Sequence, residues 1–202
     1  MMKKLALLAL FVLCGLALVV GYLLLPSPHY TTKFQACAIT LDGKGVLVWF
    51  EIYAQPGSGK TFVNIQNARF REDTEQSLLE ARAAAEEALG VSMRGYDITL
   101  DMLTPQENVA GESAGAAFAS ALVANYLQRG MRSDAVISAA LTDGGELSPV
   151  GGIDEKMIAA AEAGKTVFVI SENQTIKHAE IGQRIRIVRA DTLADALPNL
   201  IE

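Results

Sequence analysis

The residue pattern predicts a single mixed domain, α/β or α+β in class, preceded by one transmembrane helix. Two observations carry this prediction. In the second half of the chain, segments typical of strands alternate with segments of helical period. At the start, residues 5–25 form an unbroken apolar run without a charged side chain. A helix of that length spans about 30 Å, the thickness of the hydrocarbon core of a bilayer.

The apolar run predicts three regions: a membrane anchor over residues 1–25, a polar tether over 26–33 and a globular domain over 34–202. A cleaved signal peptide is the alternative. Its apolar region usually has about 7–15 residues and ends at small side chains, whereas this run ends with Leu25 and Pro26.

Positive charge lies on the N-terminal side of the anchor. Lys3 and Lys4 precede the apolar run, and Lys33 is the only lysine or arginine in the tether. Because basic residues favour the cytoplasmic side, we expect a cytoplasmic N-terminus and a domain outside the cytoplasm. A lipoprotein site at Cys14 is disfavoured, since large residues precede it and apolar sequence continues after it.

Charge and cysteine content exclude several classes of function. The chain of 202 residues has a net charge of −6, and the residues after the anchor carry −8, which disfavours a nucleic-acid partner. Cys37 is the only cysteine of the domain, so no internal disulfide is expected, and its apolar neighbours indicate a buried strand residue. The sequence has no cysteine–histidine cluster, so we expect neither a zinc site nor another cofactor.

The pattern of apolar residues places the elements in order. Strands are expected at 34–41, 46–53, 61–65, 96–103, 135–141, 166–170 and 184–188. Helices are expected at 73–89, 114–127 and 154–163, with a short last helix ending near Pro198. We expect Asp73 to cap the first of these helices and Ser113 the second, and Gly90 to end the first. Asp191 or Thr192 is expected to cap the last.

Residues 54–61 end in Gly59-Lys60-Thr61, as a phosphate-binding loop does. The full motif requires a glycine where Ala54 stands, and it requires a following helix whose N-terminus faces the phosphates. Residues 62–65 instead have a strand pattern. We therefore interpret this segment as a glycine-rich hairpin and not as a nucleotide site.

Two motifs predict a serine hydrolase. Ser113 lies in Gly-Glu-Ser-Ala-Gly at the start of a helix, where backbone N–H groups are available to stabilise an oxyanion. A serine hydroxyl becomes a good nucleophile only when a base removes its proton. Lys156 follows a glycine turn in the first turn of a helix and has apolar neighbours, two conditions that lower the pKa of an amine. We expect Ser113 to be the nucleophile and Lys156 its base.

These segments resemble the proteolytic domain of Lon proteases. The resemblance rests on residues 112–115, 149–156 and 159–164 together with the spacing of Ser113 and Lys156, and it extends over most of residues 36–200. It implies an α+β fold of mixed sheets with packed helices, a polypeptide substrate and a homo-oligomeric ring. It also identifies the hairpin at 56–60 with a Pro-Gly-x-Gly-Lys turn of the family.

By this resemblance a hydroxyl on the strand before the glycine turn contacts the lysine, and Ser138 occupies that place. Lon commonly has an acidic residue three positions before the serine, whereas Ala110 stands here. The chain has no intact nucleotide loop, so we expect a membrane-anchored peptidase that cuts peptides or unfolded segments without ATP. The departure at Ala110 supports the alternative of a non-catalytic Lon-like module that binds peptides or acts as a scaffold.

A serine hydrolase with a histidine base is a further alternative. Residues 111–115 match the G-x-S-x-G pattern, and Asp143 or Asp154 followed by His178 has the chain order of that triad. That motif requires a strand leading directly into the serine turn, whereas about eight loop residues are expected here, which disfavours this alternative.

Overall fold

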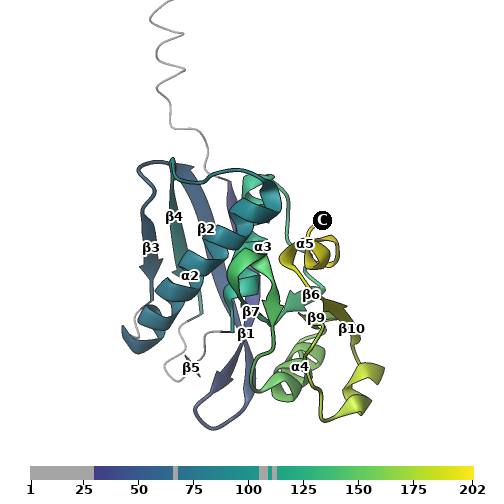
Figure 1. Ribbon diagram of the computed structural model, residues 1–202. Coiled ribbons are helices and arrows are strands. Elements are labelled where there is room, and N and C mark those ends of the chain that lie inside the picture. Colours follow the sequence, from purple (N-terminus) through teal and green to yellow (C-terminus); the bar gives the residue numbers. More distant parts are fainter. Residues whose placement is uncertain (1–29, 66–67, 105–108, 111–112) are drawn as a thin grey trace, which may run out of the picture.

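The computed structural model describes residues 30–65, 68–104, 109–110 and 113–202 (Figure 1). The anchor expected at residues 1–25 and the first part of the tether lie outside these ranges. Among the helices that the structure describes, none is both long enough and apolar enough to cross a membrane.

The larger sheet has five strands in the order β3-β4-β2-β1-β5. These strands are β1 (Thr31–Thr40), β2 (Gly45–Pro56), β3 (Thr61–Asn64), β4 (Tyr96–Met102) and β5 (Val109–Ala110). The pair β3 and β4 is parallel, and the other pairs are antiparallel. β1 and β2 form the expected hairpin, and Gly43 in its turn has a φ of +82°. β5 pairs only with Ile39 and Thr40, so the rest of that edge of β1 has no strand partner among the described residues.

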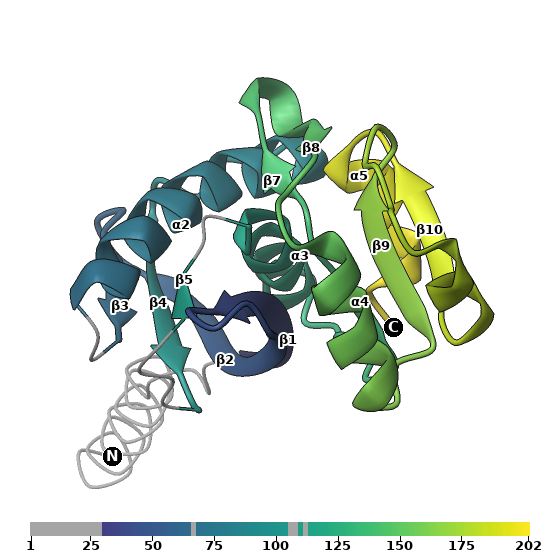
Figure 2. The ribbon, with the colours of Figure 1, turned by 90° about the horizontal axis from the view of Figure 1, so that it is seen from below.

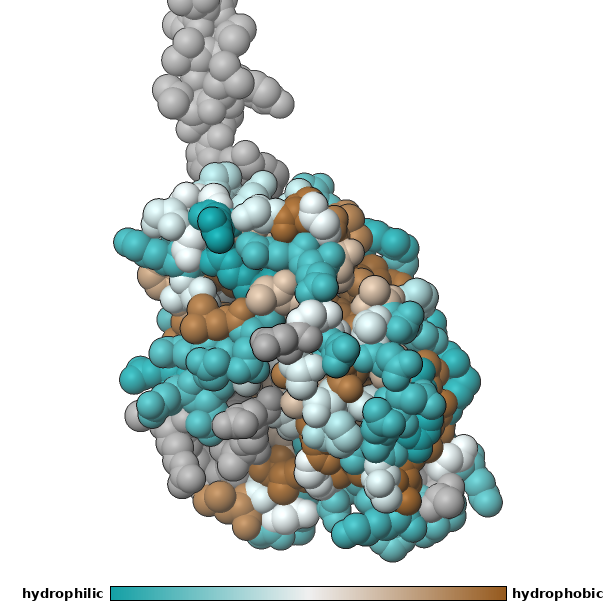
Figure 3. All heavy atoms as spheres, in the orientation of Figure 1, coloured by the Kyte–Doolittle hydropathy of each residue, from teal (hydrophilic) through white to brown (hydrophobic). Residues whose placement is uncertain are grey.

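Two helices cover one face of this sheet, α2 (Ala68–Leu89) and α3 (Gly115–Tyr126) (Figure 1). The buried rings of Phe34, Phe50 and Phe118 join β1, β2 and α3, with centroids 5.3 to 6.0 Å apart. α3 is buried along most of its length, as its small residues allow. The molecular face that carries α2 is mainly hydrophilic (Figure 3), in agreement with the charged side chains on the exposed side of this helix.

The larger sheet with α2 and α3 forms the first lobe of the domain. The second lobe contains a parallel sheet in the order β10-β9-β6. Its elements are β6 (Ala135–Ile137), β7 (Ala140–Leu141), β8 (Leu147–Ser148), α4 (Ile153–Glu162), β9 (Val167–Ser171), β10 (Arg186–Ala190) and α5 (Leu193–Ala196). β7 and β8 form a separate small hairpin. Cys37 of β1 is buried in the core of this lobe, beside Met157 and Phe168, so β1 contributes to both lobes. The larger sheet combines antiparallel pairs with one parallel pair, and the smaller sheet is parallel. With the helices packed against them, these sheets confirm the α+β class.

Several expected boundaries were wrong. α2 begins at Ala68, so Asp73 lies inside the helix and does not cap it. The N-cap of α3 is Ala114 and not Ser113, whose hydroxyl is engaged elsewhere. The strand expected at 135–141 is interrupted at Ser138 and Ala139, because the chain leaves the parallel sheet there to enter the β7–β8 hairpin.

One strand begins earlier than expected, and a further strand lies in a segment expected to be a loop. β1 begins at Thr31, inside the segment expected to be a tether, because it pairs with β2 as far as Tyr53. β5 was not expected at all; two residues carry too little pattern to be recognised. The glycine end of α2 and the capping of α5 by Thr192 were predicted correctly.

Candidate active site

Ser113 precedes Ala114, the N-cap of α3, and both ends of that helix are hydrogen-bonded to other elements. At the N-terminal end, the N–H of Ala116 donates to the carbonyl oxygen of Ala139 at 3.4 Å. At the other end, the buried side chain of Asn125 accepts from the N–H of Ala54 at 3.2 Å and donates to the carbonyl oxygen of Tyr30 at 2.6 Å. These contacts attach α3, and with it the segment of Ser113, to the strands and loops around it.

Lys156 is the fourth residue of α4, and its N–H donates to the carbonyl oxygen of Gly152 at 3.1 Å. Gly152 caps this helix with a φ of +63°, a conformation that favours glycine. The carboxylate of buried Asp154 accepts hydrogen bonds from the backbone N–H groups of Lys177 at 3.0 Å and His178 at 2.8 Å. These contacts hold the first turn of α4 against the loop after β9.

The β1–β2 hairpin rests on the first turn of α4 (Figure 2). A Cβ atom on Gly45 would lie 2.1 Å from the carbonyl oxygen of Glu155 and 2.9 Å from the backbone nitrogen of Lys156. A Cβ atom on Gly152 would lie 2.7 Å from the side chain of Ile39. Both glycines therefore permit a close approach of the two lobes. Sequence reasoning assigned no role in the site to Gly45, although its place at the end of a Gly-Lys-Gly turn is visible.

The two lobes bring the serine and the lysine together. Nζ of Lys156 donates a hydrogen bond to Oγ of Ser113 at 2.7 Å, across 43 positions of sequence. Lys156 is only 2% exposed, and burial lowers its pKa to about 8, although neighbouring Glu155 acts in the opposite direction. At pH 7 about one such lysine in ten is neutral, so an appreciable fraction can accept a proton. A hydroxyl in contact with this amine can be deprotonated when it attacks an electrophile.

Ser138 lies immediately after β6 and is fully buried. Its Oγ has no hydrogen-bond partner among the described residues, so the expected contact with Lys156 is not formed. The adjacent Ala139 accepts a hydrogen bond from the first turn of α3, which places Ser138 beside the helix that presents the nucleophile. Its role as a positioning residue stays a prediction.

The histidine alternative is not assembled. The ring of His178 interacts with Glu180 at 3.2 Å, and its side chain is 61% exposed. Asp154 contacts the backbone of His178 and not its ring. The side chains of Ala110 and Asp143 and the whole of residues 111–112 lie outside the described part, so the acidic position that Ala110 replaces is not described.

Two other expectations are resolved. The loop at 56–60 leads into strand β3 and not into a helix, so it lacks the geometry of a phosphate-binding loop. Cys37 is a buried strand residue, and burial raises the pKa of its thiol to about 12, so it stays protonated and unreactive. Within the described ranges, no group of histidine, cysteine and acidic residues is arranged to hold a metal ion.

A buried lysine amine in contact with a serine hydroxyl, between two lobes of an α+β domain, is the arrangement of a serine–lysine hydrolase site. Comparison with known families agrees with this class. Residues 39–201 match the Lon protease (S16) C-terminal proteolytic domain, and the chain belongs to that family.

The similar proteins include Lon proteases of bacteria and archaea. The chain is 28% identical to the Lon protease of Phenylobacterium zucineum over 160 residues, which cover 76% of this chain and 20% of that protein. It is 26% identical to the archaeal Lon protease of Pyrococcus abyssi, with 82% of this chain and 17% of that protein covered. It is 33% identical to the Lon protease of Methylocella silvestris, with 70% and 18% covered. The chain thus spans about a fifth of the length of these relatives.

Proposed function

We propose that this protein is a serine-type endopeptidase that uses Ser113 and Lys156 as a dyad on peptides or unfolded segments. The observation that carries the proposal is the 2.7 Å contact between the serine hydroxyl and a lysine that is 2% exposed. Membership of the Lon proteolytic-domain family supports a serine-type peptidase with a polypeptide substrate.

The proposed reaction proceeds through an acyl-enzyme. Oγ of Ser113 attacks the carbonyl carbon of the scissile peptide bond while its proton passes to the neutral amine of Lys156. The lysine then gives that proton to the leaving amine, and a water molecule, deprotonated by the same lysine, releases the acyl group. The first N–H groups of a helix have no partner within the helix. Ala116 donates its N–H to Ala139, so the N–H groups of Ala114 and Gly115, which follow Ser113, are the ones we propose for the oxyanion site.

Ser138 is proposed as a positioning residue for Lys156. A buried hydroxyl without a partner is destabilising by about 1–3 kcal/mol, so its presence beside the site suggests that it gains a partner in the working enzyme. Ser138→Ala should then lower kcat and change the midpoint of the pH profile, and Ser138→Thr should restore both. If Ser138→Ala raises stability and leaves both kinetic properties unchanged, the residue is structural only.

We further propose that the peptidase is anchored in the membrane, acts without ATP and assembles as a homo-oligomeric ring. The apolar run at residues 5–25, preceded by Lys3 and Lys4, supports an anchor with the domain outside the cytoplasm. The loop at 56–60 has no following helix, which supports ATP independence. The ring rests on the family relationship alone. Protease accessibility of the domain in intact cells tests the topology.

A serine-directed fluorophosphonate probe tests the catalytic proposal. The full chain should be labelled, and Ser113→Ala should not be labelled, with Ser92→Ala as a matched exposed control that reacts like the unchanged protein. Cleavage of an unfolded polypeptide should follow the same order and should be unaffected by added ATP. Equal and negligible labelling of all three proteins, with no cleavage, would favour the alternative of a non-catalytic peptide-binding or scaffold module.

A further inference from the structure

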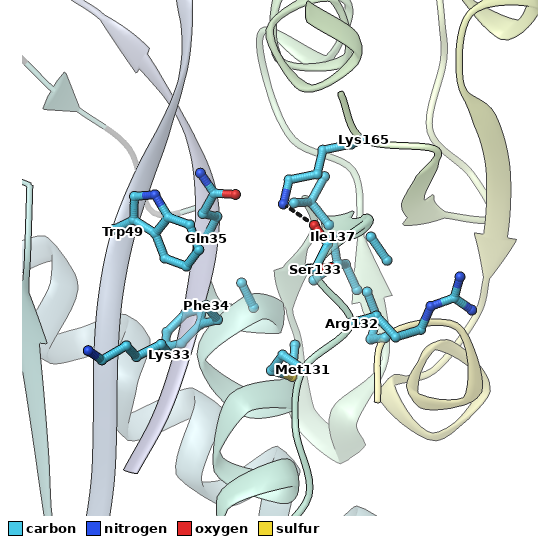
Figure 4. Close-up of a pocket in the computed structure, with 13 residues that line it drawn as sticks. Lys33, Phe34, Gln35, Trp49, Met131, Arg132, Ser133, Ile137 and Lys165 are labelled. Atoms are coloured by element: carbon cyan, nitrogen blue, oxygen red, sulfur yellow. Dashed lines mark hydrogen bonds between the residues drawn. The ribbon is translucent and has the colours of Figure 1, made fainter. Parts of the chain in front are cut away.

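A second concave feature lies apart from the serine–lysine site. A cavity of about 240 Å³ is open between the edge of β1 that lacks a strand partner and the segment around β6 (Figure 4). Phe34 and Trp49 line it on the side of the larger sheet, and Val136 and Ile137 line it on the other side. Neither Ser113 nor Lys156 is among the lining residues.

One lining residue is a buried lysine. Lys165 is 8% exposed, and its side chain extends toward Gln35 on β1 (Figure 4). Its Nζ donates to the carbonyl oxygen of Ser133 at 2.6 Å. Because an ammonium group has three donors, this hydrogen bond leaves two of them without a partner among the described residues.

The other two cations that line the cavity already have acidic partners. Lys33 pairs with Glu51 at 3.5 Å, and Arg132 pairs with Asp134 at 3.0 Å. Among the described residues, Lys165 has no such ion pair. Asp134, the acidic residue that follows Ser133, accepts two hydrogen bonds from Arg132 and one from Thr166.

An unpaired charge in an apolar environment is strongly unfavourable, and an anionic ligand would compensate it. Burial lowers the pKa of Lys165, although Cys37 and Asp134 act in the opposite direction. The apolar walls, in turn, suit a hydrocarbon group. The cavity is smaller than the range of roughly 300–1,000 Å³ typical of drug-sized ligands, so its ligand has about the size of one amino-acid residue.

We propose that this cavity binds a carboxylate on a short apolar stem, with the carboxylate on Lys165 and the stem between Trp49 and Ile137. Two sources have this chemistry: the C-terminal residue of a peptide that ends in an apolar side chain, and a short fatty acid. The proposal concerns binding and does not depend on catalysis at Ser113.

The chain supplies its own reporter, because Trp49 is its single tryptophan and lines the cavity. N-acetyl-leucine and hexanoate, titrated separately into the full-length chain, should each give a saturable change in tryptophan fluorescence. Tighter binding of N-acetyl-leucine would indicate a peptide C-terminus as the ligand, and tighter binding of hexanoate would indicate a fatty acid. N-acetyl-leucine amide, which has the same stem without the charge, should bind at least about tenfold more weakly, since a hydrogen bond to a charged group is lost.

Two variants localise the charge. Lys165→Met should weaken binding of N-acetyl-leucine at least about tenfold. Lys33→Met, a matched change at the same cavity, should alter it less than about threefold, because the charge of Lys33 is already paired. Ser113→Ala should bind as the unchanged chain does, so failure of the catalytic proposal would not affect this one.

Three outcomes would overturn the proposal. The first is the absence of a saturable signal with either carboxylate, checked by calorimetry. The second is equal affinity for the acid and its amide, a comparison that needs no variant and holds even if Lys165→Met does not fold. The third is an equal effect of Lys165→Met and Lys33→Met, which would indicate diffuse attraction and not a site.

Discussion

The two buried lysines of this domain make an instructive pair. Lys156 and Lys165 are both less than a tenth exposed, both lie near Cys37, and burial lowers the pKa of both. Their hydrogen-bond partners differ. Lys156 contacts the hydroxyl of Ser113, which has a proton to give, whereas Lys165 contacts the carbonyl oxygen of Ser133, which can only accept.

This difference decides what each lysine can do. A desolvated amine next to a hydroxyl can act as a base. An ammonium next to a carbonyl oxygen has no proton to accept from that partner, and it retains donors for an anion. Burial alone therefore does not identify a catalytic lysine; the partner of Nζ does.

Turnover gives the most direct test of the different roles assigned to the two lysines. Lys156→Met and Ser113→Ala should each reduce kcat/KM on an unfolded polypeptide by more than about 10³-fold, because they remove the base and the nucleophile. Lys60→Met, at an exposed lysine outside both sites, should change it less than about twofold. If Lys156→Met keeps more than a tenth of the activity, Lys156 is not the base.

The free energy of unfolding gives a second test, of the cost of burying Lys156. The lowering of the pKa of Lys156 from 10.5 to about 8 corresponds to about 3 kcal/mol of destabilisation at neutral pH. Lys156→Met removes this destabilisation but also loses the hydrogen bond to Ser113, which offsets part of the gain. The free energy of unfolding should therefore rise by about 1–3 kcal/mol at pH 7.

The pH dependence of that gain checks its origin. Between pH 8 and 10.5 the unfolded state binds more protons at Lys156 than the folded state does, so the unchanged protein becomes more stable as pH rises. The difference between Lys156→Met and the unchanged protein should therefore shrink in that window. Urea unfolding at pH 7 and pH 10 measures it, and a constant difference would contradict an origin in the buried charge.

The glycine contact beneath Lys156 gives a third test. Gly45→Ala forces a Cβ atom against the backbone of Glu155, so it should lower the free energy of unfolding by about 1–3 kcal/mol and reduce turnover at least about tenfold. Gly151→Ala is the matched control, since a Cβ atom there has nothing within 4 Å. Equal effects of the two changes, measured by urea unfolding and peptide cleavage, would rule out the close approach as the cause.

The pH profile of turnover is expected to show the smallest effect. Because only neutral Lys156 accepts a proton, kcat/KM should rise about tenfold from pH 7 to a plateau above pH 9, with a midpoint near pH 8. Steady-state kinetics in a constant-ionic-strength buffer measures this. A flat profile from pH 6 to 9 would argue against a lysine base.

The sequence predicted the elements of the fold better than their ends. Long patterns, such as the hairpin of β1 and β2 or helix α4, carry enough periodicity to be recognised, and Gly90 and Thr192 marked helix ends through local chemistry. The start of α2 and the break after β6 were missed. They depend on tertiary pairing, which local pattern does not contain.

The residues of the site likewise divide into those that local pattern indicates and those that depend on tertiary contacts. Ser113 and Lys156 were selected from local motifs near a helix start and a glycine turn, and the structure brings their side chains into contact; their catalytic roles stay a prediction. The contact of Gly45 with Glu155 and the hydrogen bonds of Asp154 to the loop after β9 join segments far apart in sequence, so no local pattern indicates them. The cavity at Lys165 is likewise formed by walls from both lobes.

The division of Ser113 and Lys156 between two lobes also bears on when the proposed peptidase becomes active. In an unfolded chain Lys156 has the ordinary pKa of an exposed lysine, so fewer than about one molecule in a thousand holds a neutral amine at pH 7. The serine then has no base. On the proposed mechanism, a newly made chain therefore stays inactive until β1, β2, α3 and α4 have docked, so folding itself acts as the activation step.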